Sequence, residues 1–275
     1  MIKLKEILDN VRERTPLVHN ITNYVTVNDC ANILLACGGS PIMSDDEEDV
    51  SDITSICGGL NINIGTLNKN TIPSMFIAGR RANELGHPVL LDPVGAGASK
   101  IRTETASRLI DELKLTVIRG NISEIKALSQ GSSTTKGVDA DAADQVNPSN
   151  IDSVIAFASD FAKSTGSVIA ITGATDIITD GERVCCIKNG DPMMSKVTGT
   201  GCMLSAMATA FVVANPDNAF EAVCTATISM GLAGELARGR MSAMDGNSAY
   251  RGYIIDAVFN MDGEKLEKGA KYEMR

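Results

Sequence analysis

Apolar residues recur at helical spacing over much of the chain, and short apolar runs lie between these helical segments. The periodicity predicts helices over residues 4–13, 27–36, 46–56, 72–85, 103–113, 123–128 and 151–164. Runs bounded by Gly, Pro, Asn or Asp predict strands over residues 41–43, 60–64, 88–91, 116–118 and 167–171. Because strands alternate with helices, the pattern indicates an α/β fold, in which a mostly parallel central sheet carries helices on both faces.

The last third of the chain follows a different pattern. Two short apolar runs, residues 177–180 and 184–187, are typical of a hairpin at one edge of the sheet. Further helices are predicted over residues 201–213, 219–237 and 248–259, and a polar, frayed tail over 261–275. A loop is predicted over residues 131–147, which contain Ser, Thr, Asp and Gly and few large apolar residues. No repeat or linker divides the chain, so we expect a single domain over residues 1–275.

The composition argues against nucleic acid and against a membrane as partners. The formal net charge is -9, aromatic residues make up 4%, and Trp is absent, whereas a phosphate-backbone binder needs a basic face. The longest weakly polar run, residues 203–214, is too short to span a bilayer of about 30 Å. An anionic small molecule must then be met by a helix N-terminus or by Mg²⁺.

Cysteine usage and the first residues point to the cytoplasm. The seven cysteines include no CxxC pair, so we expect reduced thiols and neither a disulfide framework nor a zinc site. Residues 1–10 lack the apolar core of a signal peptide.

The positions of the strands select the places where a ligand should bind. In open α/β sheets the ligand lies outside the carboxyl ends of the strands. The segments that this rule selects are residues 43–45, 65–67, 92–97, 119–124 and 172–175.

The clearest local signal is the glycine turn in KVTGTGCMLS, residues 196–205. The chain passes through Gly199 and Gly201 into the N-terminus of a helix of small residues. Its free N–H groups can form an anion hole that stabilises charge on a transferring phosphoryl group. An ordinary helix cap with flexible glycines is the plainer interpretation. The chain contains no GxxxxGK[ST], and GxGxxG does not fit this turn.

Cys202 lies in the first turn of that predicted helix. There the helix dipole favours a thiolate and lowers the thiol pKa, which would suit a general base near an acceptor hydroxyl. Alternatively, Cys202 only packs at the helix start and leaves room for substrate. The sequence weights these two interpretations equally.

Carboxylates follow two of the predicted strands. Asp92 begins the segment DPVGAG, and Glu124 follows Asn121 by three residues in RGNISE. Such hard oxygen ligands suit Mg²⁺ that bridges nucleotide phosphates. As local structure, Asn121 and Glu124 make a capping pair and Asp92 a turn acid. Arg119 lies beside Asn121, a position that favours phosphate contact through its planar guanidinium.

Two other segments carry polar groups. Residues 171–176, ITGATD, offer the hydroxyl of Thr172 to phosphate oxygens or a ribose, although a plain turn is equally compatible. Residues 18–28 alternate polar and apolar positions and suggest a substrate-recognition loop, with Met43 as an adaptable apolar wall.

Together these motifs resemble the hydroxyethylthiazole kinase family, a branch of the ribokinase-like superfamily. The resemblance spans residues 14–240. The segments that carry it are PLVHNITNYVTVND, SPIMSDD, NIGTL, LDPVGAGAS, RGNISEI, ITGATD and VTGTGCMLSA.

The resemblance implies a ribokinase-like three-layer sandwich and phosphorylation of 4-methyl-5-(2-hydroxyethyl)thiazole by ATP and Mg²⁺ in thiamine synthesis. It also implies a homotrimer with active sites between subunits. The residue roles that it implies are Met43, Gly199 and Asn23 at the thiazole alcohol, Arg119, Thr172 and Asn121 at ATP, and Asp92 and Glu124 at the metal. Many ribokinase-like enzymes have an aspartate base at position 202, where this chain and the thiazole kinases have Cys.

Two other functions remain as alternatives. One is a nucleotide-dependent dehydratase that acts on hydrated nicotinamide cofactor, against which the HNITN and SPIM segments argue. The other is a nucleotide-binding regulator without turnover, which intact Asp92, Glu124 and the glycine turn disfavour. The resemblance thins beyond Arg240, and residues 131–147 are richer in Thr and Asp than the segments around them.

Overall fold

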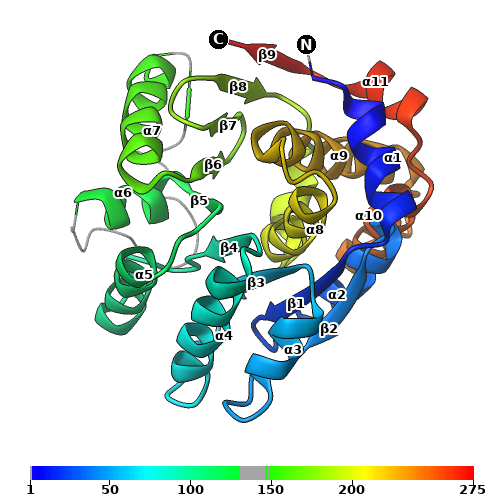
Figure 1. Cartoon of the computed structure of the whole chain (residues 1–275). Coiled ribbons are helices and arrows are strands. Elements are labelled where there is room, and N and C mark those ends of the chain that lie inside the picture. Colours follow the sequence, from blue (N-terminus) through cyan, green and yellow to red (C-terminus); the bar gives the residue numbers. More distant parts are fainter. Residues whose placement is uncertain (1, 131–145, 148) are drawn as a thin grey trace.

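The computed structural model describes residues 2–130, 146–147 and 149–275. The loop predicted over 131–147 therefore lies outside the described residues, except for its last two positions. In the described part of the chain one nine-stranded sheet, in the order β2-β1-β3-β4-β5-β6-β7-β8-β9, has helices on both faces (Figure 1).

The elements follow the predicted order closely. The strands are β1 (Leu17–Ile21), β2 (Ser40–Met43), β3 (Gly59–Asn63), β4 (Val89–Asp92), β5 (Val117–Asn121), β6 (Val168–Thr172), β7 (Asp176–Thr179), β8 (Val184–Ile187) and β9 (Tyr272–Met274). The helices are α1 (Leu4–Arg14), α2 (Val27–Cys37), α3 (Val50–Ile56), α4 (Thr71–Leu85), α5 (Lys100–Glu112), α6 (Ile122–Gln130), α7 (Ile151–Thr165), the 3₁₀-helix η2 (Pro192–Lys196), α8 (Thr200–Ala214), α9 (Ala219–Arg240), α10 (Asn247–Phe259) and α11 (Gly263–Gly269).

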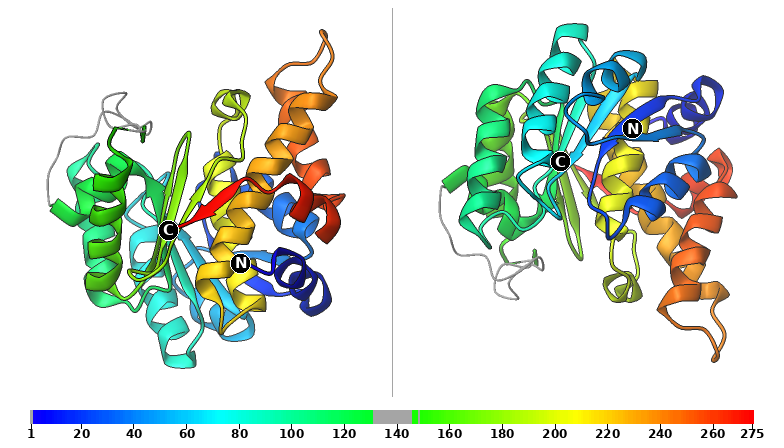
Figure 2. Two further views of the ribbon diagram at one scale, coloured as in Figure 1. Left: turned by 90° about the horizontal axis from the view of Figure 1, so that it is seen from above. Right: turned by 90° about the horizontal axis from the view of Figure 1, so that it is seen from below.

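The sheet is mostly parallel, which confirms the predicted fold class. Strands β2, β1, β3, β4, β5 and β6 pair in parallel. Strands β7, β8 and β9 extend the sheet by antiparallel pairing. Helices α3 to α7 cover one face, and α8 and α9 lie on the other with α1, α2, α10 and α11 around them, so the molecule has three layers (Figures 1 and 2).

Each face of the sheet has its own hydrophobic core, because successive strand residues point to opposite sides. Leu90 packs with the core around α8 and α9, whereas Leu91 packs with the core around α4 to α7. The adjacent Cys185 and Cys186 divide in the same way. This alternation gives both cysteines a packing role that the sequence alone did not assign.

Helix α8 lies almost entirely inside the protein. From Met203 to Ala214 nearly every residue is buried, since the helix packs between the sheet on one side and α2 and α9 on the other. A Cβ on Gly59 would lie 2.4 Å from Cγ2 of Val213, so glycine in β3 lets α8 pack closely on the sheet. The N-terminus of α8 is thereby fixed relative to the ends of the strands.

The chain reverses its direction across the sheet at β1. It passes from β1 through α2 to β2 on one side, and then through α3 to β3 on the other side of β1. The connections after β1 and β3 therefore diverge and leave a crevice at the carboxyl ends of these strands, where α/β proteins bind their ligands.

The predicted recognition loop over residues 18–28 is wrong in its first part, because residues 17–21 form strand β1 inside the sheet. The sequence did not predict this strand because it contains polar residues. In the structure these residues have hydrogen-bond partners inside the protein. His19 Nδ1 lies 2.9 Å from Thr54 Oγ1, and Nε2 lies 2.9 Å from the carbonyl oxygen of Ser44. Burial lowers the pKa of His19, which favours the neutral ring. Only residues 22–26 remain as a loop before α2.

The predicted frayed tail is also wrong. Residues 263–269 form α11, whose first turn is capped by the Asp262 side chain, and β9 pairs with β8. The hairpin of β7 and β8 is confirmed, but β9 and not β8 is the edge strand. Few apolar residues mark this segment, yet Leu266 is fully buried.

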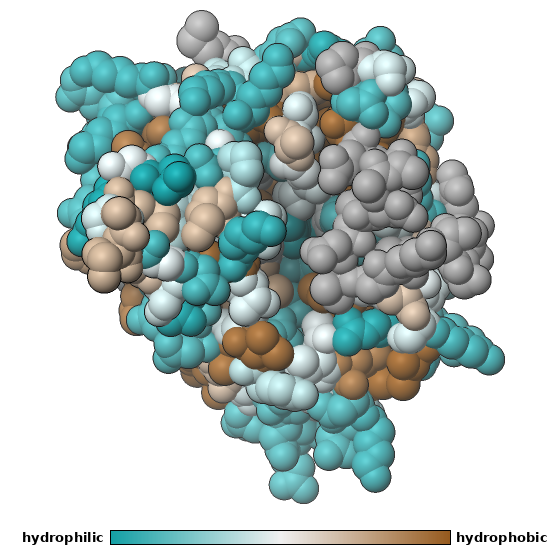
Figure 3. All heavy atoms as spheres, turned by 180° about the vertical axis from the view of Figure 1, so that it is seen from behind, coloured by the Kyte–Doolittle hydropathy of each residue, from teal (hydrophilic) through white to brown (hydrophobic). Residues whose placement is uncertain are grey.

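The face of the molecule seen from behind is mainly polar where it is coloured. Hydrophilic residues dominate there, and hydrophobic ones form small separate groups (Figure 3). Within the described ranges, no helix combines the length and the apolar character needed to cross a membrane.

We predict that Leu266→Ala lowers the free energy of unfolding by about 2–5 kcal/mol, because it leaves a cavity under α11. The control is Leu35→Ala on α2, where the side chain is 57% exposed and a change within about 0.5 kcal/mol is expected. Urea denaturation measures both. Equal stabilities for the two variants would show that residues 263–269 contribute nothing to the folded core.

Candidate active site

The carboxyl ends of β3, β4, β5 and β6, the loop after β1 and the N-terminus of α8 surround one cavity of about 640 Å³. All the predicted site residues except Met43 line it, although they are distant in sequence. They are Asn23, Asp92, Arg119, Asn121, Glu124, Thr172, Gly199, Gly201 and Cys202.

Met43 lies elsewhere. It lines a smaller neighbouring cavity of about 160 Å³, together with Asn20, Val27, Asn63 and others. The two cavities have Thr66 in common. The structure therefore does not place Met43 and Gly199 in one cavity, although both were predicted to contact the substrate.

The glycine turn allows two close approaches that a side chain would block. Gly199 has φ of 89°, in the left-handed region, and a Cβ there would lie 2.4 Å from Cγ2 of Thr26. A Cβ on Gly201 would lie 2.6 Å from Nη1 of Arg119. The N-cap residue of α8 is Gly199, which has no side chain to cap the helix. Its first N–H groups can therefore serve an anion in the cavity.

Arg119 links this turn to the strands. Its Nη2 donates to Oγ1 of Thr172 at 2.6 Å, and its Nη1 donates to Oδ2 of Asp92 at 3.4 Å. The side chain is only 13% exposed. A guanidinium held in this way between a carboxylate and an open cavity provides a fixed positive charge for a phosphate group.

Asp92 is fully buried at the end of β4, and its two oxygens differ. Oδ2 accepts hydrogen bonds from Ser205 Oγ at 2.7 Å and Asn63 Nδ2 at 2.9 Å, in addition to Arg119. Oδ1 has no partner among the described residues. Burial raises the pKa of Asp92, and the charge of Arg119 partly offsets this effect.

Glu124 has the capping geometry that the sequence suggested. Its Oε2 accepts from the backbone N–H of Asn121 at 2.8 Å, while Asn121 Oδ1 accepts from the N–H of Glu124 at 2.9 Å. Its Oε1 accepts from the N–H of Gly95 at 2.7 Å, which ties α6 to the loop after β4. Burial, together with the negative charge of Asp92, raises the pKa of Glu124 to about 7.

The number of carboxylates here suits a Mg²⁺ ion that binds together with a nucleotide. A metal ion held by protein side chains alone would need more ligands than these two. Mg²⁺ in nucleotide sites takes one or two carboxylates and completes its shell with phosphate oxygens and water. Asp92 Oδ1 is a buried oxygen with no hydrogen-bond partner among the described residues, which leaves it available as a ligand. In the described residues no group of three or more His, Cys, Asp or Glu could hold a metal ion.

Cys202 contradicts one expectation from the sequence. Burial, followed by the negative charge of Asp92, raises the pKa of this thiol instead of lowering it. Asn23 Nδ2 donates to Sγ at 3.3 Å. The position at the helix N-terminus is as predicted, but desolvation and a nearby carboxylate outweigh the helix dipole.

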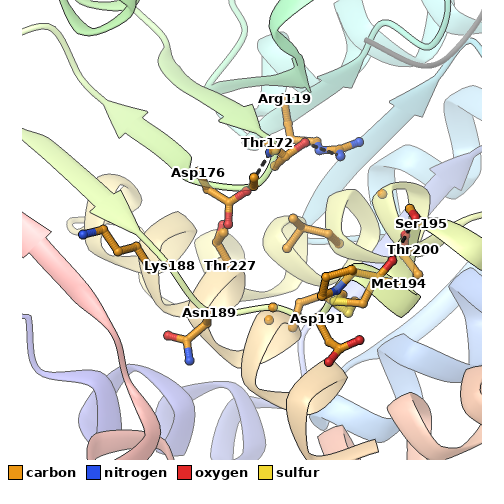
Figure 4. Close-up of a pocket in the computed structure, with 18 residues that line it drawn as sticks. Arg119, Thr172, Asp176, Lys188, Asn189, Asp191, Met194, Ser195, Thr200 and Thr227 are labelled. Carbon is orange, nitrogen blue, oxygen red and sulfur yellow. Dashed lines mark hydrogen bonds between the residues drawn. The ribbon is translucent and has the colours of Figure 1, made fainter. Parts of the chain in front are cut away.

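Another large cavity, of about 550 Å³, adjoins the cavity of about 640 Å³ and is called the second cavity below. The residues that line both are Arg119, Thr172, Met194, Ser195, Thr200 and Gly201. In Figure 4, Arg119 and Thr172 lie at one end of this cavity, with Asp176 beside them. Asp176 Oδ1 accepts from the N–H of Gly173 at 2.9 Å, and burial raises the pKa of Asp176 to about 7.

Sequence reasoning missed Asn63, Ser205 and Asp176 as site residues. A signal existed for two of them, because Ser205 follows Gly201 by one helical turn and Asp176 ends the ITGATD segment. Asn63 ends a strand only in the structure, since the predicted strand continues to residue 64. What the sequence could not show is that Asn63 and Ser205 contact the same carboxylate.

Comparisons with known proteins find relatives that match nearly the whole chain. The model of the hydroxyethylthiazole kinase family matches residues 8–264. A hydroxyethylthiazole kinase of Clostridium acetobutylicum is 63% identical over 98% of this chain and 99% of its own length. The structure of a hydroxyethylthiazole kinase protein from Pyrococcus horikoshii OT3 has a TM-score of 0.88 and 33% identity, covering 99% of this chain and 98% of its own.

A more distant structure supports the ribokinase-like fold. The pyridoxal kinase from Staphylococcus aureus in complex with ADP has a TM-score of 0.62 at 15% identity, and the match covers 94% of this chain and 97% of that one. At this identity the likeness concerns the fold alone.

We predict that Asp176→Asn becomes increasingly favourable to stability as pH rises. The folded pKa of Asp176 is raised from 3.8 to about 7, so between these values the folded chain holds a proton that the unfolded chain has lost, and wild-type stability falls with pH. Asn carries no charge and its amide oxygen can still accept from Gly173.

From about pH 5 to about pH 8, the difference in unfolding free energy between variant and wild type should grow by more than about 1.4 kcal/mol, the value of one pKa unit. Urea denaturation without ligands measures it. Parallel pH profiles for the two proteins would contradict the raised pKa of Asp176.

Proposed function

The chain belongs to the hydroxyethylthiazole kinase family, and on that premise we propose that it transfers the γ-phosphoryl group of ATP to the hydroxyl of 4-methyl-5-(2-hydroxyethyl)thiazole in thiamine synthesis. The observation that supports this most directly is the convergence of Arg119, Asp92 and the uncapped N-terminus of α8 on one cavity. Phosphoryl transfer asks mainly for positioning and for stabilisation of negative charge, and these groups supply both.

ATP would extend across the two large cavities. Arg119, Thr172, Thr200 and Gly201 line both, so phosphates placed at these residues leave the second cavity for the nucleoside. The Arg119 guanidinium and the N–H groups of α8 would hold the transferring phosphoryl oxygens. Asn121, the register partner of Thr172 across β5 and β6, also lines the first cavity and would contact ATP there.

Asp92 and Glu124 are the residues that would hold Mg²⁺. Held there, Mg²⁺ would supply positive charge that stabilises the negative charge of the phosphates. The polar side chains around Asp92 orient its carboxylate, and the backbone N–H groups of Gly95 and Asn121 orient that of Glu124.

The thiazole alcohol would lie between Met43 and Gly199. We place the ring toward the smaller cavity at Met43 and the hydroxyethyl group toward Asn23 and Cys202, since Thr66 lines both cavities. Asn23 Nδ2 donates a hydrogen bond to Cys202 Sγ, so the two side chains lie together and both could contact the acceptor hydroxyl. A thiol with a raised pKa stays neutral at pH 7, which favours a role in shaping the site over one as a base.

The wider setting is part of the same proposal. We infer one ribokinase-like domain over residues 1–275, a homotrimer with active sites between subunits, and a cytoplasmic location. Family membership supports these points.

The proposal predicts ADP release that depends on the thiazole alcohol, measured in a coupled assay with ATP and Mg²⁺. Arg119→Ala should lower kcat by about 10²-fold or more, the usual cost of losing a donor to the transition state. This variant controls for contaminating kinases. No alcohol-dependent ADP release, together with dehydration of the nicotinamide hydrate, would favour the dehydratase, whereas ATP binding without any turnover would favour a regulator.

We further predict that Cys202→Ser retains kcat within about tenfold of wild type, because a general base usually contributes 10²–10⁴-fold. Serine is similar in size but cannot form an anion near neutral pH. The pH profile of kcat should keep its shape in the variant. A loss of about 10³-fold, or the disappearance of one limb of the profile, would show that the thiolate is the base.

A further inference from the structure

The hydrogen bonds to Asp92 are all on one oxygen. Ser205, Asn63 and Arg119 each donate to Oδ2, whereas the buried Oδ1 has no partner in the described part of the chain. Leaving a buried charged oxygen without a partner costs free energy. An arrangement that served stability alone would distribute the donors over both oxygens.

The two neutral donors come from elements that are themselves firmly held. Ser205 is fully buried in α8, and Asn63 is almost fully buried at the end of β3. The orientation of the Asn63 amide follows from its other contacts: its Oδ1 accepts from Asn23 Nδ2 at 3.0 Å and from the N–H of Gly65 at 2.9 Å. Its Nδ2 is therefore the group that faces Asp92.

We propose that Ser205 and Asn63 are positioning residues that occupy Oδ2 of Asp92 and so direct its free Oδ1 toward the metal-bound triphosphate. This inference rests on the proposed function, since it takes Mg²⁺ and a nucleotide as the ligands. Two hydrogen bonds from different elements fix the plane of a carboxylate, as groups behind metal ligands commonly do.

Asn63 has a second task that Ser205 lacks. Through Oδ1 it holds Asn23, which contacts Cys202 on the side of the acceptor hydroxyl. Loss of the Ser205 hydroxyl should thus affect the metal alone, whereas loss of the Asn63 amide should affect both the metal and the alcohol.

The test measures how much a metal ion strengthens nucleotide binding. A β,γ-methylene analogue of ATP is titrated calorimetrically into wild type and Ser205→Ala, once with EDTA and once with Mn²⁺. We expect Ser205→Ala to reduce the Mn²⁺-dependent gain in affinity by about 10–100-fold, the usual effect of removing a group behind a metal ligand. Metal-free affinity should stay within twofold, because Arg119 and the α8 N-terminus remain.

Ser229→Ala is the matched control. It makes the same substitution in a buried helix, at a hydroxyl that has no partner among the described residues, and it should match wild type in every titration. Thermal unfolding of the unliganded variants verifies that each is folded.

Asn63→Ala adds an independent readout. It should reduce the Mn²⁺-dependent gain as Ser205→Ala does and also raise the KM for the alcohol, which Ser205→Ala should leave within twofold. A Mn²⁺-dependent gain that is unchanged in folded Ser205→Ala and Asn63→Ala would overturn the inference and leave the kinase proposal intact. Wild type that binds the Mn²⁺-nucleotide but does not phosphorylate the alcohol would overturn the kinase proposal alone, because the titrations do not involve the alcohol.

Discussion

The candidate active site depends on the buried carboxylate of Asp92, which accepts its hydrogen bonds from the described residues through one oxygen, Oδ2. Asp92 is fully buried and accepts hydrogen bonds from three donors, and among the described residues the only cation in contact with it is Arg119, at 3.4 Å. A charge in this environment is tolerated only when fixed dipoles and charges surround it. The glycine at 201 lets Arg119 approach the α8 N-terminus, so one cation both stabilises Asp92 and faces the proposed phosphate site.

The fold was predictable wherever burial imposed a simple pattern. Apolar runs marked the inner strands, and helical periodicity marked α1, α2, α4 and α7 within a residue or so. Strand β1 was not predicted because His19 and Asn20 are polar, and they have hydrogen-bond partners in segments far away in sequence. Helix α11 and strand β9 were not predicted because a short helix and an edge strand need few apolar residues.

The site was predictable as a set of residues but not as an arrangement. The rule that ligands lie beyond the carboxyl ends of parallel strands gathers Asp92, Arg119, Glu124 and Thr172 at one edge of the sheet. It cannot show that Met43 lines a separate cavity, because that depends on how the loops after β1 and β3 pack. Nor can it predict whether the helix dipole or desolvation has the larger effect on the pKa of Cys202. Burial is what raises this pKa, and burial depends on the tertiary structure and not on the local sequence.

The neutral thiol at position 202 is consistent with the rest of the site. An anion there would lie close to Asp92 in a buried pocket, and two like charges without a second cation raise each other's pKa. In a loose phosphoryl-transfer transition state the acceptor oxygen has formed little bond to phosphorus, and its proton has gained little acidity. A strong base therefore contributes less than alignment. In the proposed mechanism, Asn23, Asn63 and Asp92 would supply that alignment, because two consecutive amide side chains connect the proposed acceptor position at Asn23 to the carboxylate of Asp92.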